Sequence, residues 1–299
     1  MGTSAYAQEP PLAPSRLQRV DAPLTGAVSD LQIRARLTPA DGFIEGAAIE
    51  ETRSRQVKPE VFKAWLAKSN AVFSTGISSS SPASIVEVAG RWDHADKTLT
   101  SFGIPFSHIK SRDLSESILS GCKVLVINCA GEIRRDKLQL IRDFVSRGGY
   151  LLSTDWALDN MLSNTFPGTV VWNKAVNKID IYDARYVSPD AVLARHTVAR
   201  SRWKLDESSH LVRILSDRVR LLVASSQLAL EDPDHLGALA VEFPFGRGYV
   251  LHMVGHFDNN AKIAIGNFLP DSSPDLGISL RQAIAANFIV AGLTGEKIQ

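Results

Sequence analysis

The chain has 299 residues, of which 44% are hydrophobic and 22% charged, an ordinary composition for a globular protein with a core of ample size. Because 33 basic residues face 32 acidic ones, the net charge is +1, and we expect no general attraction to nucleic acid or to an anionic membrane. No apolar run approaches the roughly 18–20 residues that span a bilayer, so no membrane span is expected.

Two cysteines occur, Cys122 and Cys129. They are too few for a four-cysteine zinc site or a disulfide scaffold. A reducing, cytoplasmic location is the simplest interpretation. Residues 5–8 resemble the end of a signal peptide, but no apolar segment precedes them, so we expect no working signal in this chain.

The first 68 residues are predicted to form an N-terminal extension. Residues 1–40 hold five of the fourteen prolines and show no apolar period, which favours an extended arm. A short helix is expected over residues 58–68, with Pro59 in its first turn. Such an arm suits contact with a protein partner or with a second copy of the chain.

Residues 69–299 are predicted to form one α/β domain. Strands are expected over residues 71–74, 106–109, 123–128 and 150–154, and a helix over 134–146. Another helix is expected after the serine run 78–81, because Pro82 suits a first turn and apolar residues follow at helical spacing: Ile85, Val88, Ala89, Trp92 and Leu99. This alternation predicts a flavodoxin-like, open, mostly parallel sheet with helices on both faces.

The second half of the domain is richer in strands. They are expected over residues 179–187, 218–225, 237–243 and 249–254, with a turn at 246–248 between the last two. A helix over residues 279–291 is expected to end the domain.

In this order, the segments 144–155, 203–212 and 246–257 resemble the class I glutamine amidotransferase-like superfamily, and its trehalose-utilisation-like branch most of all. Residues 144–155 (FVSRGGYLLSTD) resemble the family's helix that ends in Gly-Gly before the nucleophile strand. Residues 203–212 (WKLDESSHLV) resemble a late segment, and residues 246–257 (GRGYVLHMVGHF) its final hairpin, where a histidine follows the strand. The resemblance covers roughly residues 70–295.

The resemblance implies a cysteine nucleophile in the tight turn after the fourth strand. By register, Asp155 stands at this position, and Trp156 and Ala157 replace the usual small residue and glycine. The family's glutamate two residues after its histidine is also missing, because Phe257 and Asp258 follow His256. We therefore expect no glutaminase activity.

Asp155 has two interpretations. It is most simply the N-cap of the following helix, with a carboxyl pKa lowered by backbone amides and by the helix dipole. Alternatively, it is a nucleophile, a general base or a metal ligand.

Cys129 is the other candidate nucleophile. With His256 and Asp258 it would complete a triad, whereas the simpler interpretation is a small, half-buried cysteine beside the sheet. His252 is expected to be a packed strand residue, because it lies about 13 Å from His256 along a strand, too far to share an ion.

A ligand is expected at the carboxyl ends of the strands, as in other open α/β sheets. The residues predicted to bind it are Asn128, Gly131, Asp155, Trp156, His256 and Asp258. No metal site and no cofactor are expected, and the serine run lacks the pattern of a nucleotide P-loop.

Together these observations favour a non-catalytic domain that acts as a binding or assembly module in a larger complex. The alternative is a hydrolase-like enzyme that uses Asp155, His256 and Asp258, with or without a metal ion, or that uses Cys129.

Overall fold

The computed structural model describes residues 80–178, 181–195, 197, 200–256 and 280–298, together with Glu60, Lys63, Ala64, Ala67 and Ala71. These five single residues are helical, and four of them fall within the helix expected over residues 58–68. The strand expected over residues 71–74 does not begin at Ala71. The predicted arm, residues 1–40, and Asp258 lie outside the described residues, so the proposed domain boundary stays a prediction.

A nine-stranded mixed sheet forms the centre of the domain, in the order β2-β1-β3-β4-β11-β10-β9-β6-β7. The first five strands are parallel: β1 (Ile85–Val88), β2 (Ser107–Ile109), β3 (Val124–Ile127), β4 (Tyr150–Thr154) and β11 (Gly248–Met253). The sheet continues with antiparallel pairings of β10 (Ala238–Phe245), β9 (Arg220–Ala224), β6 (Ile181–Tyr186) and β7 (Arg200–Lys204). A separate antiparallel pair consists of β5 (Val170–Val176) and β8 (His210–Ile214).

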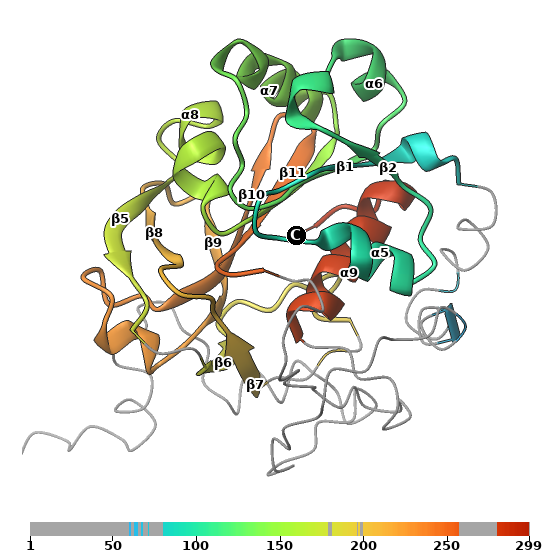
Figure 1. Cartoon of the computed structure of the whole chain (residues 1–299). Coiled ribbons are helices and arrows are strands. Elements are labelled where there is room, and N and C mark those ends of the chain that lie inside the picture. Colours follow the sequence, from blue (N-terminus) through green and yellow to red (C-terminus); the bar gives the residue numbers. More distant parts are fainter. Residues whose placement is uncertain are drawn as a thin grey trace, which may run out of the picture.

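Helices cover both faces of the sheet, as Figure 1 shows. On one face lie α5 (Ala95–Ser101) and α9 (Leu280–Thr294), and on the other α6 (Glu116–Ser120), α7 (Leu138–Ser146) and α8 (Ser163–Thr165). Short helical turns are η2 (Pro82–Ser84), η3 (Ser111–Asp113), η4 (Arg135–Lys137), η6 (Leu228–Leu230) and the π-helical η5 (Leu158–Leu162). The predicted α/β class, with a parallel core and helices on both faces, is confirmed.

The helix predicted after the serine run is wrong. Ser81 does cap a turn, since its hydroxyl accepts a hydrogen bond from the amide of Ala83, but that turn ends at Ser84 and β1 follows. Of the apolar residues that match helical spacing, Ile85 and Val88 lie in β1 and Leu99 in α5, whereas Ala89 and Trp92 lie in the segment between them. A β-branched run favours a strand, and the polar interruption at Glu87 does not break it, because the buried Glu87 carboxyl pairs with His108 and Asn128.

The strands in the parallel half of the sheet are buried because apolar side chains pack against both of its faces. Every residue of β1, β3 and β4 is buried, as expected for strands covered on two sides. Helix α9 is buried from Leu280 to Gly292, and at Gly292 an added Cβ would lie 2.5 Å from Val124. This close approach seats the helix on β3 and β4, and requires glycine there.

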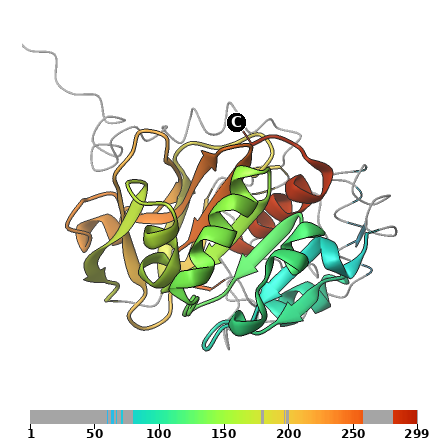
Figure 2. The same ribbon diagram turned by 90° about the horizontal axis from the view of Figure 1, so that it is seen from above.

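The order of the strands determines where side chains from distant segments meet. Strands β2 and β3 lie on opposite sides of β1, so the strand order reverses at β1. Open α/β sheets bind ligands at the carboxyl ends of the strands at such a topological switch point. Figure 2 shows the early strands and the later ones at opposite ends of the molecule, with β11 joining the two parts. Consequently β3, β4 and β11 are adjacent and end at one edge.

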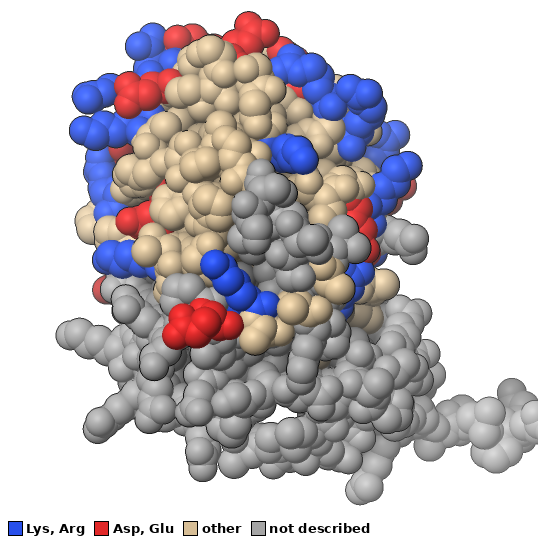
Figure 3. Space-filling model, turned by 90° about the vertical axis from the view of Figure 1, so that its right-hand side faces the viewer, with Lys and Arg blue, Asp and Glu red and all other residues tan. Residues whose placement is uncertain are grey.

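Three strands of the second half, β5, β7 and β8, are not predicted from the sequence, because their residues alternate irregularly between apolar and polar. On the face shown in Figure 3, basic and acidic side chains are interspersed, in keeping with the small net charge. Among the described residues, no helix has the length and apolar character needed to cross a membrane.

Candidate functional site

Three side chains from separate strands meet at the carboxyl edge of the parallel sheet. Cys129 lies just after β3, Asp155 just after β4, and His256 after β11. All three are buried, and their donor atoms lie within 4.8 Å of one another. The parallel strands thus bring together a thiol, a carboxylate and an imidazole, although Cys129 and His256 are more than 100 residues apart in the sequence.

Asp155 adopts a left-handed backbone conformation, with φ of 44°, and the residue is only 2% exposed. Its amide donates to the carbonyl of Met253 over 2.9 Å, which ties the turn to β11. One carboxylate oxygen accepts a 2.8 Å hydrogen bond from the Ser209 hydroxyl, and the other a 3.0 Å bond from the amide of His210. The carboxylate is therefore held by the loop before β8.

The predicted N-cap role of Asp155 is wrong. The π-helical turn begins after Ala157 and has no side-chain cap, because the left-handed turn directs the carboxylate toward Ser209 and His210 instead. Burial raises the pKa of the Asp155 carboxyl above its ordinary value, although His256 and the two hydrogen-bond donors act in the opposite direction. The expected lowering of this pKa is also wrong.

His256 connects Asp155 to a second carboxylate. Its Nδ1 lies 3.0 Å from an oxygen of Asp206, and its Nε2 lies 3.7 Å from an oxygen of Asp155. Burial alone would lower the pKa of His256, but Asp93, Asp206 and the neighbouring thiol outweigh it and raise this pKa to about 11. In the protein without a bound ion, the imidazole is therefore protonated at neutral pH.

Cys129 is fully buried rather than half-buried, with 1% exposure. Its amide donates to the Thr154 hydroxyl, which in turn donates to the Asp93 carboxylate over 2.6 Å. Burial is the largest influence on the thiol and raises its pKa above the ordinary value. The side chain is consequently a neutral thiol at pH 7, which is a weak nucleophile.

These residues face a cavity of about 460 Å³, which we call the site cavity. Its wall includes two tryptophans and a polar turn between β7 and β8, in addition to the three residues above. The lining residues are Trp92, Cys129, Asp155, Trp156, Asp206, Glu207, Ser208 and His256. Sequence reasoning missed Asp206, Glu207 and Ser208, although the segment 203–212 carries the resemblance and has a dense polar run as its signal.

One wall of the site cavity is stiffened by stacked rings. The His210 ring stacks on Trp172 at 3.9 Å between centroids and lies 5.3 Å from Trp156. The Trp156 indole donates to the carbonyl of Ser208 over 2.8 Å, and the His210 ring bonds to the Asp159 carboxylate over 2.7 Å. Trp156 is thereby held in place beside Asp155.

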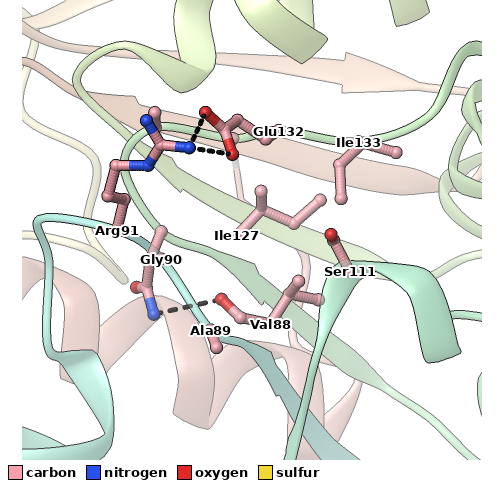
Figure 4. A pocket seen from close by; sticks show the side chains of 11 residues that line it. Val88, Ala89, Gly90, Arg91, Ser111, Ile127, Glu132 and Ile133 are labelled. Carbon is pink, nitrogen blue, oxygen red and sulfur yellow. Dashed lines mark hydrogen bonds and ion pairs between the residues drawn. The ribbon is translucent and has the colours of Figure 1, made fainter.

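Two other residues predicted to bind ligand, Asn128 and Gly131, line a different hollow of about 290 Å³ at the ends of β1 and β3. Figure 4 shows this hollow, with the ion pair of Arg91 and Glu132 at its side. The Asn128 amide donates to Glu87 and to the Val88 carbonyl. Gly131 serves packing, since an added Cβ would lie 2.5 Å from Ala157.

His252 is a packed strand residue, as expected. It is fully buried on β11, and one ring nitrogen lies 3.0 Å from the Ser153 hydroxyl. Burial lowers the pKa of His252 to about 3, so its ring is neutral. It takes no part in the site cavity.

No protein-family model and no curated protein matches the sequence. Solved structures with similar folds include a β-galactosidase from Bacillus circulans, with a TM-score of 0.48 and 12% identity, covering 78% of this chain and 34% of that one. A glutamine amidotransferase from Thermotoga maritima has a TM-score of 0.41 and 15% identity, with coverage of 56% and 73%. A cytoplasmic protein from Salmonella typhimurium has a TM-score of 0.44 and 12% identity, with coverage of 69% and 97%. This chain therefore spans about a third of the β-galactosidase, and the three comparisons concern the fold only.

Replacing Asp155 tests how its carboxylate is held. Asp155→Ala leaves the His210 amide without its acceptor, leaves the Ser209 hydroxyl only the Asp206 carbonyl at 3.3 Å, and places alanine in the left-handed region, so the free energy of unfolding should fall by about 2–4 kcal/mol. Asp155→Asn keeps an oxygen acceptor and tolerates that conformation, and it should cost about 1 kcal/mol. Urea denaturation measures both, with the exposed Asp217→Ala as control. Equal losses for the two variants would contradict this arrangement.

Proposed function

We propose that this protein is a non-catalytic glutamine amidotransferase-like domain, of the trehalose-utilisation-like branch, that acts as a binding module in a larger complex. The observation that carries the proposal is Asp155 itself. It occupies the left-handed turn after β4, where an active member of the superfamily would keep its cysteine nucleophile. Both of its oxygens are already engaged by Ser209 and His210, which favours a role in holding the turn.

The site cavity supports a binding role for a positively charged side chain. Trp92 is 53% exposed at its rim, and exposed tryptophans are frequent anchors of protein interfaces. Asp206 and Glu207 add two carboxylates to the same wall. An arginine or lysine of a partner protein would find a cation–π surface and an ionic contact together. The partner in this proposal therefore inserts a basic side chain.

Two further elements of the proposal lie beyond the site. The arm of residues 1–40, which is outside the described residues, would add partner contacts and assist assembly. A reducing, cytoplasmic location suits the two cysteines, which are both free thiols.

Binding of N-acetylarginine N-methylamide, measured by calorimetry in the presence of a metal chelator, tests the cavity. The peptide should bind, and Trp92→Ala should weaken binding by about twofold to fivefold, the effect of an exposed cation–π contact. Glu207→Gln should weaken it by a similar factor. Leu230→Ala, which removes another exposed apolar side chain away from the cavity, should have no effect.

The neutral isostere N-acetylcitrulline N-methylamide serves as the matched ligand and should not bind. If it binds as well as the arginine peptide, or if Trp92→Ala leaves affinity unchanged, the basic-anchor proposal is wrong.

A second candidate function, a thiol hydrolase, is favoured by one observation. Cys129, His256 and Asp206 lie in the order nucleophile, base and orienting carboxylate, with Asp206 taking the place expected for Asp258. The raised thiol pKa opposes it, because a neutral Cys129 lacks the reactive thiolate.

Turnover separates the two functions. With chelator present, our proposal predicts no glutamate release from glutamine and no hydrolysis of p-nitrophenyl acetate above the level of the Cys129→Ser variant. Cys122→Ser, which removes the cysteine at the opposite edge of the sheet, is the matched control. Ester hydrolysis that Cys129→Ser abolishes and Cys122→Ser retains would establish the hydrolase instead.

A further inference from the structure

We propose that Cys129, Asp155 and His256 bind one zinc ion, leaving a fourth coordination position open to the site cavity. This proposal uses the cavity of the proposed function but does not depend on that function. It revises the expectation of no metal site and takes up the alternative in which Asp155 is a metal ligand. Within the part of the chain that the structure describes, this is the group of side chains suited to hold a metal ion.

The spacing of the donor atoms fits a tetrahedral ion. Two ligands each about 2.1 Å from a tetrahedral zinc ion lie about 3.4 Å apart. Nε2 of His256 lies 3.7 Å from the Asp155 oxygen, within a few tenths of an ångström of this value. The three donor atoms all lie within 4.8 Å of one another, close enough for one ion to contact all three after small side-chain shifts.

The hydrogen bonds made to the side chains of His256 and Asp155 are of the kind that orients metal ligands. Asp206 lies 3.0 Å from Nδ1 of His256 and would hold the ring proton there, while the Nε2 proton of the ion-free protein would leave as the ion binds. Asp155 is likewise fixed by Ser209 and His210. Imidazole ligands commonly receive such carboxylate support, and ligating carboxylates are commonly held by further donors.

Two features show that the space between Cys129, Asp155 and His256 lacks a bonding partner for these side chains. Nε2 of His256, a residue that is 7% exposed, has no hydrogen-bond partner among the described residues. The buried carboxyl group of Asp155 is the second feature, since its nearer oxygen lies 3.7 Å from that nitrogen, beyond hydrogen-bond distance. A divalent cation bound at the centre would satisfy the unpaired nitrogen and offset the buried negative charge together.

The donor set selects the kind of ion. One sulfur, one nitrogen and one carboxylate oxygen suit zinc, whereas magnesium and calcium require oxygen ligands only. Three protein ligands with an open fourth position are typical of zinc sites that bind a water or a ligand atom. Trp92, Glu207 and Ser208 line the same cavity and would surround a ligand bound at that position.

The test uses the full chain, first stripped with a chelator and then titrated with Zn²⁺ or Co²⁺. We expect one equivalent to bind, and Co²⁺ to give a near-ultraviolet thiolate-to-cobalt absorption band. Cys129→Ser and His256→Gln should each weaken zinc binding by more than about 100-fold. Asp206→Asn, a positioning substitution, should weaken it by about 10-fold to 100-fold.

Cys122→Ser is the matched control and should keep both the affinity and the band. If Cys129→Ser does not fold, Cys122→Ser still identifies the sulfur ligand. Cys129 is the one cysteine left in that variant, so a thiolate band must come from Cys129. Failure of the wild-type chain to bind an equivalent, loss of the band in Cys122→Ser, or unchanged affinity in a folded Cys129→Ser variant would overturn the proposal. The arginine-peptide measurement is made in chelator, so its failure is distinct from this one.

Discussion

The buried carboxylate of Asp155 is the constraint on which the carboxyl edge of the sheet depends. A carboxylate removed from water must find hydrogen bonds and a compensating charge, because its desolvation is otherwise costly. Ser209 and His210 provide the hydrogen bonds, and His256 provides the nearby charge. The loop between β7 and β8, the turn after β4 and the end of β11 are therefore tied to one another through a single side chain.

The topology of the sheet makes this arrangement available. Strands β3, β4 and β11 are neighbours and run in the same direction, so their carboxyl ends present Cys129, Asp155 and His256 at one edge. The small two-stranded sheet then brings β8 and its preceding loop across that edge. A basic side chain of a partner and a zinc ion would occupy the same cavity in different ways. Both would be attracted by the acidic residues in its wall.

Much of the parallel core could be predicted from the sequence, because uninterrupted apolar runs such as 124–127 and 150–154 have few alternatives to a buried strand. Local periodicity failed at residues 85–88, where a helical spacing arose by coincidence within a β-branched run. The position of Asp155 in the turn after a strand was predicted correctly. Its partners were not, since Ser209 and Asp206 reach the site through a loop whose path depends on long-range strand pairing.

Asp155 and His256 stabilise one another within a single buried charge cluster. A double-mutant cycle with Asp155→Asn and His256→Gln, measured as free energies of unfolding in chelator at neutral pH, tests this stabilisation most directly. We expect a coupling energy on the order of 1–3 kcal/mol, as found for interacting buried groups. Additive losses, with a coupling energy near zero, would contradict it.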